Sequence, residues 1–146
     1  MHYFLCDLVL DIFQNGIEAG ASLLVLSIEE KENSSGERIF GFSVKDNGKG
    51  MDEKELQKAL DPFYTDGIKH PGRKIGLGLP FLVQTAEVSG GSWEINSGED
   101  GTEVKAWFSL ECIDTPPIGD IEGLFRSALL FKDDIEIVLR YNGNLL

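Results

Sequence analysis

Three oxygen-bearing side chains lie at helical spacing near the start of the chain. Asp11, Asn15 and Glu18 are separated by four and three residues, so a helix would place them on one face. An amide and carboxylates arranged in this way can hold Mg²⁺ through a few oxygens and leave positions for phosphate and water. The solvated face of an ordinary amphipathic helix has the same pattern, and this helix taken alone favours that simpler interpretation.

A carboxylate followed by a glycine-rich turn forms the second candidate group. Asp46 ends an apolar segment and is followed by Asn47, Gly48, Lys49, Gly50 and Met51. Glycines let the backbone approach a flat ligand closely, and a carboxylate at this place can accept a hydrogen bond from an adenine amino group. An ordinary strand-to-helix turn would explain the same residues.

The third group is a glycine pair directly before a predicted helix. Gly76, Leu77, Gly78 and Leu79 precede Pro80, which suits the first turn of a helix. Backbone N–H groups at a helix start attract phosphate. Four basic or ionisable residues lie just upstream, and they could either contact a polyanion or belong to a solvated loop: Lys69, His70, Arg73 and Lys74.

The periodicity of apolar residues predicts the elements that would position these groups. Helical spacing indicates helices over 4–19, 52–60, 79–89 and 120–131, with Asp52 and Glu55 forming a capping box at the second. Alternating or β-branched segments indicate strands over 23–29, 38–45, 92–97, 103–110 and 135–141, the first four as two hairpins. Residues 61–78 have four glycines and two prolines and no sustained periodicity, so we expect a mobile loop.

Length and composition limit the class of protein. The chain has 146 residues, enough for one domain, and a formal charge of -12, which disfavours nucleic acid or an anionic membrane as a partner. Cys6 and Cys112 are far apart, so neither a disulfide framework nor a zinc site is indicated. The apolar start is interrupted by Asp7 and Asp11 and has no cleavage site, so we expect a complete, soluble chain in the cytoplasm.

Taken in order, these motifs resemble those of the GHKL superfamily of ATPases and kinases, over residues 5–110. Residues 11–19 are similar to its N box, 46–50 to its first glycine box, 61–65 to the F box of histidine kinases, 76–79 to the second glycine box, and Gly101-Thr102 to the last box. The resemblance implies a Bergerat fold, an α/β two-layer sandwich with a mixed sheet and helices on one face. It also implies ATP and Mg²⁺ as cofactors, with Asp11 catalytic and Asn15 on the metal. Its nucleotide contacts would be Asn15, Asp46, Gly48, Gly50, Met51, Phe63, Lys74, Gly76, Leu77, Gly78, Leu79 and Thr102.

Departures from the family pattern leave two functions open. Asp11 stands where hydrolysing members carry glutamate, and a base misplaced by about 1 Å can cost roughly a hundredfold in rate. One hypothesis is therefore a stand-alone kinase that phosphorylates a partner protein, like anti-sigma-factor kinases, or completes a split histidine kinase, or hydrolyses ATP slowly. The other is a regulatory binding module that nucleotide switches with negligible turnover. His2 and His70 are the only histidines in the sequence, and neither lies in a helical hairpin of the kind that carries a phosphoacceptor, so we do not expect a self-contained sensor histidine kinase.

The segment after Pro117 extends beyond the family pattern. We expect an ATP-binding domain over 1–112 and a helix-strand extension over 113–146 packed on the same domain, since its apolar residues are dense enough for a core. A docking surface for a partner is the alternative.

Overall fold

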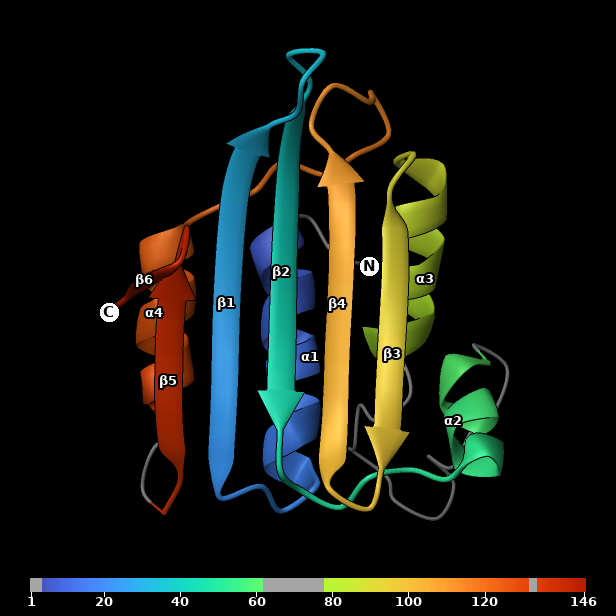
Figure 1. The fold of residues 1–146 in the computed structure, drawn as a ribbon, viewed down its shortest axis with the longest axis vertical. Helices are drawn as coiled ribbons and strands as arrows, with labels where there is room; N and C mark the ends of the chain where they lie inside the picture. The colour runs from blue at the N-terminus through green and yellow to red at the C-terminus, as the bar shows by residue number, and fades with distance from the viewer. Residues whose placement is uncertain (1–3, 62–77, 132–133) are drawn as a thin grey trace.

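The computed structural model describes residues 4–61, 78–131 and 134–146. It has two layers, a six-stranded sheet and four helices, and Figure 1 shows α1, α3 and α4 behind the sheet with α2 beside its lower edge. The helices are α1 (Leu5–Glu18), α2 (Glu53–Leu60), α3 (Gly78–Val88) and α4 (Ile121–Leu129). The strands are β1 (Leu23–Glu32), β2 (Arg38–Asp46), β3 (Ser92–Gly98), β4 (Gly101–Ser109), β5 (Glu136–Tyr141) and β6 (Asn144–Leu145). The predicted two-layer α/β sandwich is confirmed.

The sheet is mixed, with the strand order β3-β4-β2-β1-β5-β6. Both predicted hairpins form, β1 with β2 and β3 with β4, and β2 pairs with β4 between them. Among the strands that the structure describes, only β5 and β1 pair in parallel, which makes the sheet mixed. The short strand β6 was not predicted, because two residues are too few for a period-2 pattern.

The core lies between the sheet and the helices. In α1, the apolar face that the spacing predicted is buried, and in the central strands every second residue is buried on the same side. Phe40 and Phe42 of β2 pack on Phe108 of β4, with ring centroids 6.4 and 6.3 Å apart. Buried aromatic packing of this kind fixes the register of β2, whose last residue is Asp46.

Local signals set the ends of the helices. The predicted capping box of α2 is present, since Glu55 N–H donates to Asp52 at 2.7 Å and Asp52 N–H to Glu55 at 3.2 Å. The predicted stop after α3 is confirmed by Gly90, which has a φ of 71° that favours glycine. Observed boundaries differ from the predicted ones by at most three residues: β1 ends at Glu32 rather than at 29, and α4 ends at Leu129 rather than at 131.

The segment after β4 packs on the same core. The carbonyls of Pro117 and Ile118 accept the first N–H groups of α1, from Leu5 at 2.8 Å and Cys6 at 3.0 Å. Further along, the rings of Phe131 and Phe13 lie 6.1 Å apart. The extension is therefore joined to α1 at both ends of α4.

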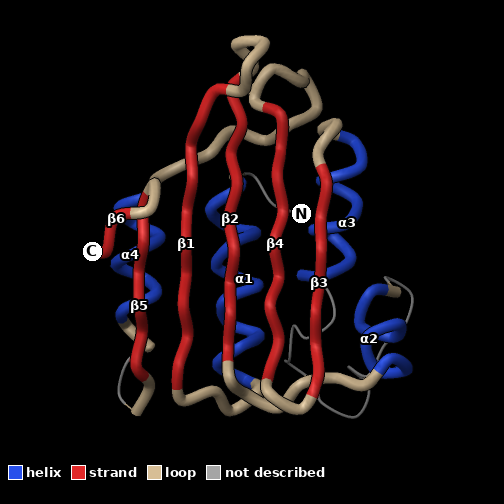
Figure 2. The backbone as a smooth tube through the Cα atoms, in the orientation of Figure 1, coloured by secondary structure: helices blue, strands red, loops and turns tan. Residues whose placement is uncertain are grey.

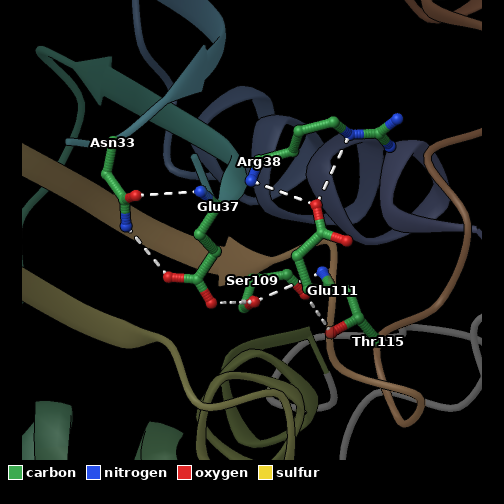
Figure 3. Close-up of polar contacts among 6 residues, drawn as sticks. All are labelled: Asn33, Glu37, Arg38, Ser109, Glu111 and Thr115. Atoms are coloured by element: carbon green, nitrogen blue, oxygen red, sulfur yellow. Dashed lines mark hydrogen bonds and ion pairs between the residues drawn. The ribbon is translucent and has the colours of Figure 1, made fainter. Parts of the chain in front are cut away.

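Two ends of the sheet carry different polar groups. Figure 2 shows the loops after α1, β2 and β3 gathered at one end. At the other end, Figure 3 shows a hydrogen-bonded group of six residues, which ties the segment after β4 to the β1–β2 hairpin. Its members are Asn33, Glu37, Arg38, Ser109, Glu111 and Thr115. In the part of the chain that the structure describes, no helix has both the length and the apolar character needed to cross a bilayer.

Candidate functional site

Asp46 is the buried carboxylate of the loop end of the sheet. It is the last residue of β2, opposite Thr102 in β4, and only 9% exposed. One carboxylate oxygen accepts the Gly48 N–H at 2.8 Å. Burial raises the pKa of Asp46, and the backbone N–H groups of Gly48 and Thr102 offset only part of that rise. A buried carboxylate of this kind favours a ligand that brings a further hydrogen-bond donor to it.

Helix α1 approaches Asp46 at Gly16. A Cβ built on Gly16 would lie 3.3 Å from Oδ2 of Asp46 and 2.6 Å from Cδ2 of Leu24, so only glycine fits here without movement of Leu24. Asn15 is therefore the neighbour in sequence of Gly16, the residue that approaches the Asp46 carboxylate, and it lies on the helix that carries Asp11.

The turn after Asp46 is fastened by Asn47. Its side-chain oxygen accepts N–H groups from Ser22 at 2.8 Å and Leu23 at 2.9 Å, and its amide donates to Oγ of Ser22 at 2.9 Å. The next residues pack on the end of α1, where Lys49 N–H donates to the Ala19 carbonyl at 2.9 Å. These contacts hold the glycine turn between α1 and β1.

Gly50 and Gly101 allow the same turn to touch the β3–β4 hairpin. A Cβ on Gly50 would lie 1.6 Å from the carbonyl oxygen of Gly98, and Gly101 has a φ of 120° with a Cβ position 2.0 Å from the Asp46 carbonyl. Met51 N–H donates to Oγ of Ser97 at 2.7 Å, and that hydroxyl also contacts Oγ1 of Thr102 at 2.7 Å. A hydrogen-bonded path thus joins Met51 to Thr102, beside Asp46.

The start of α3 lies against the polar face of α1. A Cβ on Gly78 would lie 3.6 Å from Nδ2 of Asn15 and 3.6 Å from Cβ of Asp11. Gly78 lines a small hollow together with the predicted polar stripe of α1 and Gln14: Asp11, Asn15 and Glu18. Leu79, the next residue of α3, is buried in the core.

The structure thus brings most of the predicted residues to one end of the fold. Phe63, Lys74, Gly76 and Leu77, and the loop predicted around them, lie outside the described residues. Within the described ranges, no three His, Cys, Asp or Glu side chains are grouped closely enough to hold a metal ion by themselves. A metal at Asn15 would therefore need ligands from elsewhere.

Sequence reasoning missed the residues that support the site. Asn47 was noted only as part of a turn, although asparagine after a strand commonly binds the nearby backbone. Ser97 and Gln14 gave no signal, because their roles arise from contacts between distant segments.

Comparison with known proteins identifies the family to which this chain belongs. The sequence profile of the family described as "Histidine kinase-, DNA gyrase B-, and HSP90-like ATPase" matches residues 3–112. The chain belongs to this ATPase family. The match contains every candidate residue from Asp11 to Thr102.

Two curated relatives of this ATPase family member are kinases. The chain is 29% identical over 116 residues to the sensor histidine kinase ZraS of Escherichia coli (strain K12), covering 79% of this chain and 23% of ZraS. It is 35% identical over 88 residues to sporulation kinase C of Bacillus subtilis (strain 168), covering 60% of this chain and 19% of that kinase. The chain therefore spans less than a quarter of either relative.

A solved relative shows the same fold across the whole chain. The Aquifex aeolicus MutL ATPase domain complexed with ADP superposes with a TM-score of 0.56 at 16% identity. The superposition covers 99% of this chain and 62% of the MutL chain, so the ATPase fold of MutL includes a counterpart of the extension.

Proposed function

We propose that this domain binds Mg·ATP along α1, between the glycine turn after β2 and the start of α3. One observation carries the proposal: consecutive residues of α1 contact both ends of the site. Gly16 meets Asp46, a carboxylate suited to an adenine amino group, and Asn15 meets Gly78, at a helix start suited to phosphate. The family match and the ADP in the MutL structure support the same ligand class.

The contacts of the described residues divide the proposed site into an adenine part and a phosphate part. Asp46 and Thr102 would hold adenine, with Gly48, Gly50 and Met51 forming the wall of the turn. Gly78 and Leu79 would present the start of α3 to the phosphates. The resemblance extends this phosphate part to Phe63, Lys74, Gly76 and Leu77.

Asn15 fits a magnesium ion that is shared with a nucleotide. Mg²⁺ usually takes one or two protein oxygens and completes its shell with phosphate and water, so the side-chain oxygen of Asn15, whose amide group lies beside the start of α3, would be a suitable donor. When bound there, Mg²⁺ would neutralise phosphate charge. Asp11, one turn earlier on the same face, would orient the attacking group.

The reaction that we propose is transfer of phosphate to a partner protein, or slow hydrolysis. The relatives ZraS and sporulation kinase C, both kinases by name, support phosphate transfer. The short side chain of Asp11 supports an alternative, a nucleotide-dependent binding module with negligible turnover. An Asp11→Glu variant separates the two, because a large gain in phosphate release indicates a latent ATPase and no gain favours the module or an absent acceptor.

We further propose that 113–146 belongs to the same folding unit as 1–112 rather than forming a separate module. Its strand β5 pairs with β1 over six residues, and Glu136 N–H donates to the carbonyl of Ser22 at 2.8 Å. Ser22 is also a partner of Asn47, so the extension contacts the support of the glycine turn.

Calorimetric titration tests the binding proposal. The wild type is titrated with AMP-PNP and with ADP, each with and without Mg²⁺, alongside Asp46→Asn and the distant surface control Glu32→Gln. We expect magnesium-dependent binding to the wild type and the control, and loss of binding to Asp46→Asn with its fold intact by circular dichroism. Absence of binding to the wild type would reject the proposal.

A further inference from the structure

A groove separates the first half of α1 from α4. These two helices lie side by side behind the sheet (Figure 1), and the backbone at Pro117 and Ile118 joins them at one end. The groove has a volume of about 590 Å³, within the range of ligand sites in proteins. Its α1 wall includes Phe4, Asp7 and Leu10, each three residues apart, and its α4 wall includes Asp120, Gly123 and Leu124.

The interior of this groove is mainly apolar. Leu124 is buried at its floor, and Phe4 leaves 44% of its surface exposed at its edge. Gly119 and Gly123 remove side chains from the opposite wall, and Gly119 lies so close to Phe4 that a Cβ would be 2.8 Å from the Cβ of Phe4. The groove therefore offers apolar surface and space together.

The edges of the groove carry negative charge. Asp7 caps the start of α1 through the N–H of Phe4 at 3.2 Å, and Asp120 caps α4 through the N–H of Gly123 at 3.0 Å. Glu122 adds a third carboxylate, while Arg126 is the cation that pairs with Asp120 and Glu122, both at 3.7 Å. Asp7, Asp120 and Glu122 carry three negative charges and Arg126 one positive charge, so these four groups have a net charge of -2.

The negative charge near the groove affects the thiol of Cys6, which lines it. Its pKa rises to about 11, first because of burial and then because of Asp7, Asp120 and Glu30. The same carboxylates that disfavour a thiolate would favour a cation on the ligand. They oppose a second copy of this chain, whose formal charge is -12, and an anionic membrane.

We propose that this groove is a docking site for a basic amphipathic helix of a partner protein. Phe4 to Leu10 spans about 9 Å of helix axis, the length of nearly two helical turns. A helix laid along it would place apolar side chains three or four residues apart over Leu124 and flanking Lys or Arg side chains near Asp7 and Asp120. The groove uses Phe4 to Leu10, whereas the nucleotide hollow uses Asp11 to Glu18 of the same helix. A bound partner would thus contact the helix that carries Asp11.

A library of displayed helical peptides, selected on the full-length chain, tests this proposal. We expect enriched peptides with apolar residues at i and i+4 flanked by Lys or Arg. Their binding is then measured by fluorescence polarisation, and amide shifts of Gly119 and Gly123 are followed by NMR with ¹⁵N-labelled protein. Shifts confined to the sheet face would overturn the site.

Matched variants separate charge, shape and fold. Asp7→Asn with Asp120→Asn keeps both capping oxygens but removes two charges, and we expect affinity to fall about tenfold or more at low salt. Ser127→Trp fills the groove and should abolish binding, whereas Glu32→Gln, on the distant hairpin, should have no effect. Equal binding to Ser127→Trp would refute the docking site. Selection of helical peptides without basic residues would refute the basic character of the ligand. Displacement of every selected peptide by spermine at equal charge concentration would refute a helix as the ligand. AMP-PNP titration of the same variants keeps this test separate from the proposed nucleotide function.

Discussion

Replacing Gly50 by alanine gives the sharpest test of how the glycine turn is built. The new Cβ would lie 1.6 Å from the carbonyl oxygen of Gly98 and 3.0 Å from that of Gly101, whereas ordinary van der Waals contact is 3.4–4 Å. Both neighbours are backbone, so neither can move aside by changing a rotamer. Overpacking typically costs about 1–3 kcal/mol, and displacement of the turn would also remove the Met51 N–H bond to Ser97, worth about 1 kcal/mol. We expect a total loss of about 3 kcal/mol.

Gly98→Ala is the matched control in the same contact. Nothing lies within 4 Å of the Cβ position of Gly98, and its φ is not in the left-handed region. Urea denaturation followed by circular dichroism measures both variants, with the m-value checked for constancy. If Gly50→Ala lies within about 0.5 kcal/mol of the wild type, the close approach of the two backbones is wrong.

Three further perturbations test the surroundings of this turn. Without nucleotide, Asp46→Asn should be more stable than the wild type at pH 7. Burial raises the folded-state pKa of Asp46, so its stabilising contribution is fully present below the unfolded value of about 4 and is lost as pH rises through the folded value. The stability difference between the two proteins, measured by urea titration from pH 3 to 8, should grow with pH, and a constant difference would contradict this argument. Asn47→Ala should lose about 1–3 kcal/mol because three side-chain hydrogen bonds disappear, whereas Asn47→Asp, which keeps both acceptor contacts, should lose less. Thermal denaturation distinguishes these variants, and equal losses would show that the amide oxygen is not the anchor. Iodoacetamide at pH 8 should label Cys112 in the native protein and leave Cys6 unmodified, because Cys6 is 6% exposed and its pKa is about 11. Mass spectrometry of peptides locates the label, and prompt labelling of Cys6 would mean that the start of α1 opens readily.

Local patterns predicted the elements well because each has its own signal. The 3.6-residue spacing of α1 and the alternation in β1 and β2 arise from burial on one side, which the sequence records directly. The turn at Asn142 and Gly143, both with positive φ, carries the typical Asn-Gly pair, yet the strand after it is too short to be recognised.

Contacts between distant segments could not be predicted from spacing. The parallel pairing of β5 with β1, the approach of Gly16 to Asp46, and the bond from Met51 to Ser97 depend on which surfaces meet in three dimensions. The resemblance supplied the neighbourhood of Asp46 and Thr102, and their pairing in register agrees with it. It supplied no information on the groove beside α4, since α4 lies beyond the matched residues.

The way α1 begins has a mechanical consequence. Phe4 is extended, and the N–H groups of Leu5 and Cys6 already donate to Pro117 and Ile118. A helix arriving from upstream could not continue into α1 without breaking these two bonds, so rotation or sliding of such a helix would stop at Phe4. Force applied to residues 117 and 118, by contrast, would reach α1 directly through these two bonds. A displacement of residues 117 and 118 is therefore expected to move the start of α1 with them.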